Sequence, residues 1–452
     1  MVGSETTRTE PSEVEGQSTG LGPRRLAWTV VVEVLRSRAA LDDVFARHAA
    51  QAALPLRDVS LARAIATVLF RRFGTIRRAL DERLARGWPG DDRFETLLAV
   101  GAAQLLFLDV PDHAAVDTTV RLAAGDKRLK PFMGLANAML RRIGRERGGI
   151  VDRSEALRDD TPDWLAERWT AHFGEDRART IAEAHRRGAA LDLTVKDDPH
   201  AWAERLGGIV LPTGSVRLSP GGPPVRELPG YEAGAWWVQD AAAALPARLI
   251  APRPGERIAD LCAAPGGKTA QLASAGAQVL AVDRSAKRLE RLNENMARLA
   301  LSVETKAADV LALPDEPVFD AVLLDAPCTA TGTIRRHPDV AWTKRERDIG
   351  QLADLQRRLL DKAAGLVRPG GRLVYCTCSL EPEEGADQAE AFGARHPNFT
   401  RVPIFPGDVG GRADFVTGAG DLRTLPCHMG YDDASSGGLD GFFAARWRRD
   451  EA

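Results

Sequence analysis

The chain has few cysteines for its length, five in 452 residues, and an odd number cannot all be paired. This argues against a disulfide framework and is typical of a protein that works in a reducing compartment, so we expect a cytoplasmic location. Cys376 and Cys378 form the only close pair, and no second pair at metal-ligand spacing accompanies them. We therefore expect no zinc site and no other bound metal.

Long apolar runs are also lacking, because no run reaches the length needed to span a bilayer. The first 22 residues are rich in Ser, Thr, Glu and Gly and lack the apolar stretch of a signal peptide. They predict a disordered tail over 1–22, and we expect no membrane partner. At 452 residues the chain is too long for one ordinary core, so two or three folded domains should follow.

The net charge is only −2, but the charge is unevenly distributed. Between Gly22 and Gly148 there are 22 Lys and Arg against 14 Asp and Glu, a balance of +8, which leaves −10 for the remainder. A basic module joined to an acidic one indicates that the first binds a polyanion. The alternative is that these arginines only solvate the outer faces of helices.

Hydrophobic periodicity divides the chain into three parts. Apolar residues recur at helical spacing over 23–147, which predicts an all-α bundle, and a mixed pattern over 148–235 predicts a small α+β domain without an aromatic stacking signature. Over 236–452 strands and helices alternate, which predicts an α/β domain with a doubly wound, mostly parallel sheet and its ligands at the carboxyl ends of the strands. The candidate strands are 257–261, 279–283, 303–307, 319–325 and 372–378.

The most informative segment is DLCAAPGGKT, residues 260–269. A strand pattern delivers the chain to a Pro-Gly-Gly turn, and the next strand ends in the acid Asp283, which is the layout of a nucleotide-type cofactor site. The final Gly-Lys-Thr also suggests a phosphate-binding P-loop. However, Cys262 replaces the first glycine of that motif, and Pro265 has no N–H to donate to a phosphate. An ordinary turn without a ligand is the remaining alternative.

Acids and thiols follow the other candidate strands, and all of them should meet at one edge of the sheet. Three acids, Asp283, Asp309 and Asp325, would repel a phosphate-rich cofactor but suit one with hydroxyls, an amine and a positive sulfur, such as S-adenosylmethionine. We expect Asp283 at the ribose diol, Asp309 near the adenine amine, and Asp260 or the turn backbone near the methionine amine. Each acid taken alone could instead cap a helix.

A thiol beside a methyl donor predicts nucleophilic catalysis on cytosine, whose C5 becomes nucleophilic only after a thiolate adds to C6. Asp325 would hold the N3/N4 edge of the base, which must be flipped out of its stack to reach the site. Cys328 and Cys378 are both candidate nucleophiles. We interpret Cys376, Cys262 and Cys427 as structural.

Several motifs together resemble the RNA cytosine-5 methyltransferases, and within them the bacterial Sun/Fmu type, which methylates a cytosine of 16S rRNA. These motifs are VQD (238–240), DLCAAPGGKT, DAPCTATGTIRRHPD (325–339), PGGRLVYCTCS (369–379) and DGFF (440–443). Two further segments, VPDHAAV (110–116) and NAMLRR (137–142), are similar to the NusB-like RNA-binding domain of that type. The resemblance covers residues 25–448.

The resemblance implies a Rossmann-like class I methyltransferase core at 236–452, preceded by a NusB-like bundle at 23–147 and a linker domain at 148–235. It implies that Cys378 is the nucleophile and that Cys328 helps to release the product, with Asp325 and Lys268 completing the catalytic set. The implied cofactor, S-adenosyl-L-methionine, would be held by Cys262, Ala263, Ala264, Pro265, Gly266, Gly267, Lys268, Asp283, Asp309 and Asp325.

The expected partner is RNA, namely 16S rRNA in an unassembled or partly assembled small subunit, bound by a monomer. We expect its phosphates to be contacted by basic residues after the Pro-Cys motif and on the last helix of the bundle, unless these are solvated helix residues: Arg335, Arg336, His337, Arg141 and Arg142. The alternatives are a tRNA cytosine-5 methyltransferase on the same core, or a non-catalytic RNA-binding assembly or antitermination factor.

Overall fold

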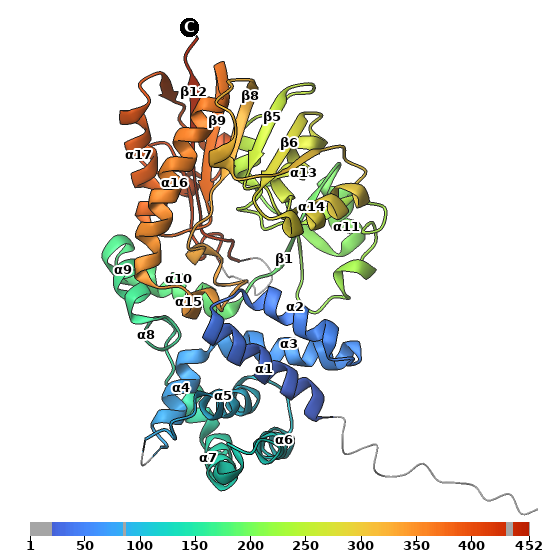
Figure 1. Ribbon diagram of the computed structural model, residues 1–452, viewed down its shortest axis with the longest axis vertical. Helices are drawn as coiled ribbons and strands as arrows, with labels where there is room; N and C mark the ends of the chain where they lie inside the picture. The colour runs from blue at the N-terminus through green and yellow to red at the C-terminus, as the bar shows by residue number, and fades with distance from the viewer. Residues whose placement is uncertain (1–19, 85–86, 431–436, 452) are drawn as a thin grey trace, which may run out of the picture. The chain divides into compact units, whose positions relative to one another are not determined.

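The computed structural model describes residues 20–84, 87–430 and 437–451, and the chain forms two compact units (Figure 1). The first unit contains the described residues up to Ala166 together with His337–Thr343, and the second contains Glu167–Arg336 and the residues from Lys344 onward. Most of the predicted tail at 1–22 lies outside the described residues, and the first helix begins at Leu21. Within the described ranges, no helix is long and apolar enough to cross a membrane.

The first unit is helical, as the sequence predicts. Its central helix, α5 (Asp92–Phe107), is buried along almost its whole length, from Phe94 to Leu106, because other helices surround it. The helices that pack on it are α1 (Leu21–Ser37), α3 (Leu56–Arg71), α4 (Phe73–Asp81), α6 (Asp112–Ala124) and α7 (Met133–Asp152). In addition, α2 (Leu41–Gln51) packs on α1, and the short α8 (Ala156–Asp159) packs on α4.

A short segment from the C-terminal half of the sequence, residues 337–343, packs with the helices of the first unit. Within residues 337–343, which include α15 (Val340–Thr343), the indole of Trp342 donates to Phe70 O at 2.8 Å. The Trp342 ring also packs edge-on against Phe73 at 5.1 Å, and the Asp339 carboxylate accepts from Leu41 N at 3.0 Å. This division differs from the expected boundaries, because 148–166 and 337–343 both cluster with the helices.

The second unit begins with helices and a small sheet. After α9 (Asp163–Phe173) and α10 (Glu175–Arg187), four short strands pair antiparallel in the order β2-β3-β1-β4. These strands are β1 (Leu191–Val195), β2 (Gly208–Val210), β3 (Val216–Leu218) and β4 (Trp236–Val238), and α11 (Pro199–Leu206) packs on β2 and β3. The α+β character expected for this stretch is present.

The main sheet has the strand order β10-β12-β9-β8-β5-β6-β7, with β11 paired to β12. Five strands pair parallel, and their positions agree with the predicted strands to within a few residues: β5 (Arg257–Leu261), β6 (Gln278–Asp283), β7 (Glu304–Ala307), β8 (Phe319–Asp325) and β9 (Val367–Thr377). The strand order reverses beside β5, which is the place where sheets of this kind bind their ligands, at the carboxyl ends of the strands.

Helices cover both faces of this sheet because successive strand residues point to opposite sides. Leu324 lies in the same apolar cluster as Leu360 of α16 (Glu346–Leu366), and α17 (Ala386–Arg395) packs on that face. Leu323 belongs to the opposite cluster with α12 (Leu245–Leu249) and α13 (Gly267–Ser274), and α14 (Ala286–Arg298) packs on Ala281. The predicted doubly wound α/β core is confirmed.

Three C-terminal strands were not predicted. They are β10 (Phe399–Arg401), β11 (Leu422–Thr424) and β12 (Phe442–Arg449), and all of them pair antiparallel. Two are only three residues long, and β12 is buried on both faces at its start, so it lacks the alternation that marks a strand. Because β12 pairs with β9 and sets Phe443 opposite Thr377, the DGFF motif lies beside the residue that precedes Cys378.

Candidate active site

The turn after β5 brings the DLCAAPGGKT motif against the end of β6. Cys262 and Gly266 have φ angles of 62° and 102°, and a Cβ on Gly266 would lie 2.8 Å from Leu292 Cγ. Glycine is required at that position because any side chain would meet this neighbour. Ala264 N then donates to Asp283 Oδ2 at 3.3 Å, so the turn and the acid meet as the sequence predicts.

The carboxylates of Asp283 and Asp309 also accept hydrogen bonds from backbone N–H groups two residues later in the chain. Asp283 is 2% exposed and accepts from Ser285 N at 2.9 Å, and Arg288 lies 3.1 Å from its second oxygen. Asp309 is exposed and accepts from Leu311 N at 2.9 Å, which caps the short helix at Val310–Ala312. A carboxylate has about four acceptor positions, so capping leaves each acid able to accept from a ligand.

Asp260 is fully buried with one oxygen unsatisfied. Its Oδ2 accepts from Thr269 Oγ1 at 2.6 Å, whereas Oδ1 has no hydrogen-bond partner within the described ranges. Burial raises the pKa of Asp260 to about 7, the Thr269 hydrogen bond opposes this, and the charge of Asp325 adds to it. A buried acceptor without a donor fits the amine of a ligand, so these residues fit the predicted methyl donor.

Lys268 joins the DLCAAPGGKT turn to β8, the strand that precedes the Pro-Cys motif. Its Nζ lies 2.7 Å from Asp325 Oδ2 and 4.9 Å from the centre of the Phe442 ring. Burial alone would lower the pKa of Lys268, but Asp325 and the thiols of Cys376 and Cys378 raise it above its usual value. The structure therefore keeps a buried cation beside Asp325 and the two cysteines.

Two thiols meet at the ends of β8 and β9. These strands pair in parallel with Asp325 opposite Cys376, so the residues that follow them lie side by side. The sulfur atoms of Cys328 and Cys378 are 3.4 Å apart. The hydrogen bond with Cys378, and after it burial, raises the pKa of Cys328 well above its usual value. Cys328 therefore holds its proton more strongly than an ordinary thiol does.

The other three cysteines lie in different surroundings. Cys376 is buried on the same face of the sheet as Cys378 and lies 3.4 Å from Asp325 Oδ1. Burial, and after it the charge of Asp325, raises the pKa of Cys262 to about 12, and Cys427 lies 4.0 Å from an Arg177 nitrogen. In the described part of the chain, no group of three or more His, Cys, Asp or Glu side chains could hold a metal ion.

A buried ion-pair network holds the Pro-Cys loop, residues 326–336, against two of the other motifs. Arg335 donates to Asp240 Oδ2 at 2.8 Å and to Asp440 Oδ1 at 3.1 Å, and all three side chains are at most 1% exposed. Burial alone would raise the pKa of Asp240, but Arg335 and Arg336 lower it to about 2. The VQD and DGFF motifs thus meet at one arginine of the Pro-Cys loop.

Comparison with known proteins agrees with this architecture. The family model described as 16S rRNA methyltransferase RsmB/F matches residues 247–448, and the NusB family model matches residues 22–145. Ribosomal RNA small subunit methyltransferase B of Xylella fastidiosa is 38% identical and covers 96% of this chain and 99% of the relative. The protein of the same name from Klebsiella pneumoniae is 37% identical over 78% of this chain and 86% of its own length.

This chain belongs to the RsmB/F family of 16S rRNA methyltransferases. It is therefore an RNA methyltransferase, as the motifs predicted. Among solved structures, that of PH0851 superposes with a TM-score of 0.71 at 24% identity and covers 95% of this chain and 99% of that chain. At this identity, the likeness shows the fold alone.

The expectation that Arg335 contacts RNA phosphates is wrong for this fold. Its side chain is 0% exposed, and its charge is matched by Asp240 and Asp440. The sequence pattern predicted an RNA contact or a solvated helix start, because the two acids that bury Arg335 lie about 100 residues away on either side. Arg336 is about one third exposed and also donates to Asp440, so its contact with RNA stays a prediction.

The other predicted RNA contacts lie on the helical unit. His337 is 41% exposed and lies 3.3 Å from Asp42, and its hydrogen bond lowers the pKa of that acid although burial opposes this. Arg141 and Arg142 are both exposed on α7, where Arg141 donates to Asn137 and Arg142 donates to Glu146. These three residues remain predicted RNA contacts.

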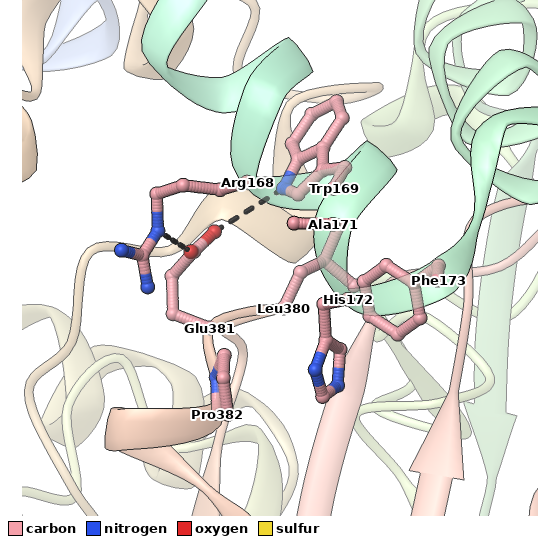
Figure 2. Close-up of a pocket in the computed structure, with 8 residues that line it drawn as sticks. All are labelled: Arg168, Trp169, Ala171, His172, Phe173, Leu380, Glu381 and Pro382. Atoms are coloured by element: carbon pink, nitrogen blue, oxygen red, sulfur yellow. Dashed lines mark hydrogen bonds and ion pairs between the residues drawn. The ribbon is translucent and has the colours of Figure 1, made fainter.

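The sequence analysis did not identify the acids that follow Cys378 as important. Glu381 is 1% exposed and accepts from Arg168 Nε at 2.7 Å, Trp169 Nε1 at 3.2 Å and Thr331 Oγ1 at 3.3 Å. Figure 2 shows the first two bonds at the edge of a pocket of about 260 Å³ between α9 and residues 380–382. The hydrogen bonds from Arg168 and Trp169 hold the segment after Cys378 against α9. The acidic run in LEPEEG, residues 380–385, was the available signal.

Proposed function

We propose that this enzyme transfers a methyl group from S-adenosyl-L-methionine to C5 of a cytosine in 16S rRNA through a covalent adduct between Cys378 and C6 of the base. The observation that carries the proposal is the pair of sulfur atoms, 3.4 Å apart, at the ends of two neighbouring strands beside the Lys268–Asp325 ion pair. A single structural cysteine would not need a second thiol at this position.

In the proposed reaction, the thiolate of Cys378 adds to C6 and the electron pair moves to C5. C5 would then take the methyl group that the donor supplies, and the sulfur of the donor would leave as a neutral thioether with the electron pair of the broken bond. Transfer of the C5 proton to solvent and cleavage of the bond between the Cys378 sulfur and C6 would restore the aromatic ring and the thiolate. Cys328 is placed to take part in that last step, because its thiol lies within hydrogen-bonding distance of the leaving sulfur.

The residues around the thiols have matching roles in this proposal. Asp325 would accept from the exocyclic amine of the cytosine, and Lys268 fixes that carboxylate through the 2.7 Å contact. Asp283 and Asp309 would bind the hydroxyls and the adenine of the donor, and the unsatisfied oxygen of Asp260 would accept from its amine. The base must leave its stack to reach these groups.

The proposed substrate follows from the relatives, which are named as methyltransferases of small-subunit ribosomal RNA, and from the NusB match at residues 22–145. The test is in vitro methylation with labelled donor, offered separately on 16S rRNA and on total tRNA, followed by bisulfite mapping of the product. Methylation of one 16S cytosine is the expected result. Labelling of tRNA alone would keep the chemistry and overturn the substrate, and label at a base other than cytosine would overturn the chemistry.

A further inference from the structure

Glu384 occupies a buried position between the two cysteine segments. It lies in the short helix Pro382–Glu384, and its side chain is 0% exposed. Its carboxylate accepts from the backbone N–H of Thr329 at 2.9 Å and 3.2 Å and also from the Thr329 hydroxyl. Thr329 directly follows Cys328, so this acid binds the chain on one side of that thiol.

The other side of Cys328 is tied to the same acid through helix α16. The Gln356 side-chain N–H donates to Glu384 Oε1 at 3.1 Å and to Pro327 O at 2.9 Å. Pro327 directly precedes Cys328. The two residues that flank this cysteine are therefore both held by the Glu384–Gln356 pair, and Gln356 is itself fully buried.

Cys378 is flanked in the same way. Thr377, which precedes it, donates through its hydroxyl to Glu384 O at 3.0 Å, and the Tyr375 hydroxyl donates to the same oxygen at 2.7 Å. Ser379, which follows it, lies with its hydroxyl 3.2 Å from the hydroxyl of Thr329. All four neighbours of the two cysteines thus belong to one buried hydrogen-bond network centred on Glu384.

We propose that Glu384 is a positioning residue that holds the Cys328 and Cys378 segments together and so sets the distance between the two thiols. This inference rests on the proposed two-thiol reaction. Fully satisfied buried networks of this kind rigidify a site, whereas a half-satisfied one loosens it. A displacement of about 1 Å at a reacting group can lower a rate by about 100-fold.

The charge of the Glu384 carboxylate affects Cys328 in addition to the hydrogen bonds. The hydrogen-bond partners described above for its carboxylate are neutral groups, so its negative charge is not cancelled by a cation among them. After the hydrogen bond with Cys378 and burial, the charges of Cys378 and Glu384 contribute to the raised pKa of Cys328. The carboxylate thus helps Cys328 to keep the proton that it shares with the sulfur of Cys378.

The distance between the thiols can be measured without any methylation. Diamide oxidises two neighbouring thiols to a disulfide: the two sulfurs lose two electrons and two protons, and the diamide is reduced to its hydrazine form. The rate of Cys328–Cys378 disulfide formation, followed by peptide mass spectrometry under non-reducing conditions, therefore reports how close the sulfurs lie. The full-length enzyme is used throughout.

Three variants test whether the Glu384 carboxylate sets the distance between the two thiols. Glu384→Gln keeps the shape of the side chain but replaces an acceptor by a donor that faces Thr329 or Gln356. Glu384→Asp keeps the charge and withdraws the carboxylate by one methylene. Glu383→Gln is the matched control, because it removes the same charge from the neighbouring residue, which is 40% exposed and pairs with Arg168.

We expect Glu384→Gln to slow disulfide formation by about tenfold and to lower kcat by about 100-fold, with donor affinity measured by calorimetry unchanged. Glu383→Gln should match the wild type in all three measurements. Rates of disulfide formation equal to the wild type in both Glu384 variants would overturn the proposal. If Glu384→Gln does not fold, the rate of disulfide formation in Glu384→Asp alone decides whether the proposal stands. A wild-type enzyme that methylates no cytosine would overturn the proposed function and leave the disulfide measurement interpretable.

Discussion

Cys328 and Cys378 are 50 residues apart in the sequence, and their sulfur atoms are 3.4 Å apart in the structure. The parallel pairing of β8 and β9 brings them together, because Cys378 directly follows the carboxyl end of β9 and Cys328 lies three residues after the carboxyl end of β8. The pairing brings both thiols to the edge of the sheet where the DLCAAPGGKT turn also lies.

We expect substitution of serine for cysteine to have opposite effects on the covalent adduct at the two positions. Cys378→Ser should abolish both methylation and the covalent adduct, because the nucleophile is lost. Cys328→Ser should instead accumulate a protein–RNA adduct, because cleavage of the bond between sulfur and C6 is impaired. Both are measured by denaturing gel electrophoresis of the enzyme with labelled 16S rRNA and the methyl donor.

Cys427→Ser serves as the control for this pair, since it makes the same chemical change at a cysteine that lies beside Arg177 and outside the proposed reaction. It should methylate like the wild type. The reverse pattern, with an adduct trapped by Cys378→Ser, would assign the attack to Cys328.

Arg335 should matter for stability and not for RNA binding. Arg335→Ala leaves Asp240 and Asp440 buried without one of their cations, which costs on the order of 3–5 kcal/mol. The midpoint of urea denaturation of the free enzyme reports this loss. Arg347→Ala, which truncates an exposed arginine, should leave the midpoint unchanged. Equal midpoints for the two variants would contradict the buried network.

Asp260 should make stability fall as the pH rises. Its pKa is about 7 in the folded protein and about 4 in an unfolded chain, so the folded state holds the extra proton between those values. Stability is therefore full below about pH 4 and is lost progressively up to about pH 7, by a few kcal/mol in total. Asp260→Asn should flatten this dependence in urea denaturation series.

Asp315→Asn, at a side chain that is 77% exposed, is the control for that series and should keep the slope of the wild type. A wild-type slope in Asp260→Asn would show that the acid is already ionised in the folded protein. With the donor present, its amine would favour the ionised form, so donor binding near neutral pH should release a proton. Calorimetry in buffers of different ionisation enthalpy detects that release.

Arg141 and Arg142 should contribute to RNA affinity through charge. Both are exposed on α7, and reversal of both to Glu should weaken 16S rRNA binding and reduce the slope of log affinity against log salt by about 1.5. The same double reversal at Arg357 and Arg358, which are half exposed on α16, is the control. An unchanged salt slope at Arg141 and Arg142 would remove them from the RNA surface.

The sequence predicted the parallel half of the sheet well and missed its antiparallel half. Strands such as 257–261 and 319–325 are short apolar runs bounded by turns, and each was found at the predicted place. The strand Phe442–Arg449 was missed because its first residues are buried on both sides, so no alternation marks it. Its position depends on pairing with β9, which lies more than 60 residues earlier in the chain.

By itself, the sequence determined the class of chemistry and the residues that meet the cofactor turn, because these depend on local motifs that follow predicted strands. Only the tertiary structure decided which charged groups are buried. Arg335 looked like a surface cation until Asp240 and Asp440 were brought to it from distant segments. Glu384 was one acid in an acidic run until folding placed it between the two chain segments that carry Cys328 and Cys378. The desolvation of a charge depends on everything packed around it, and no short stretch of sequence contains that information.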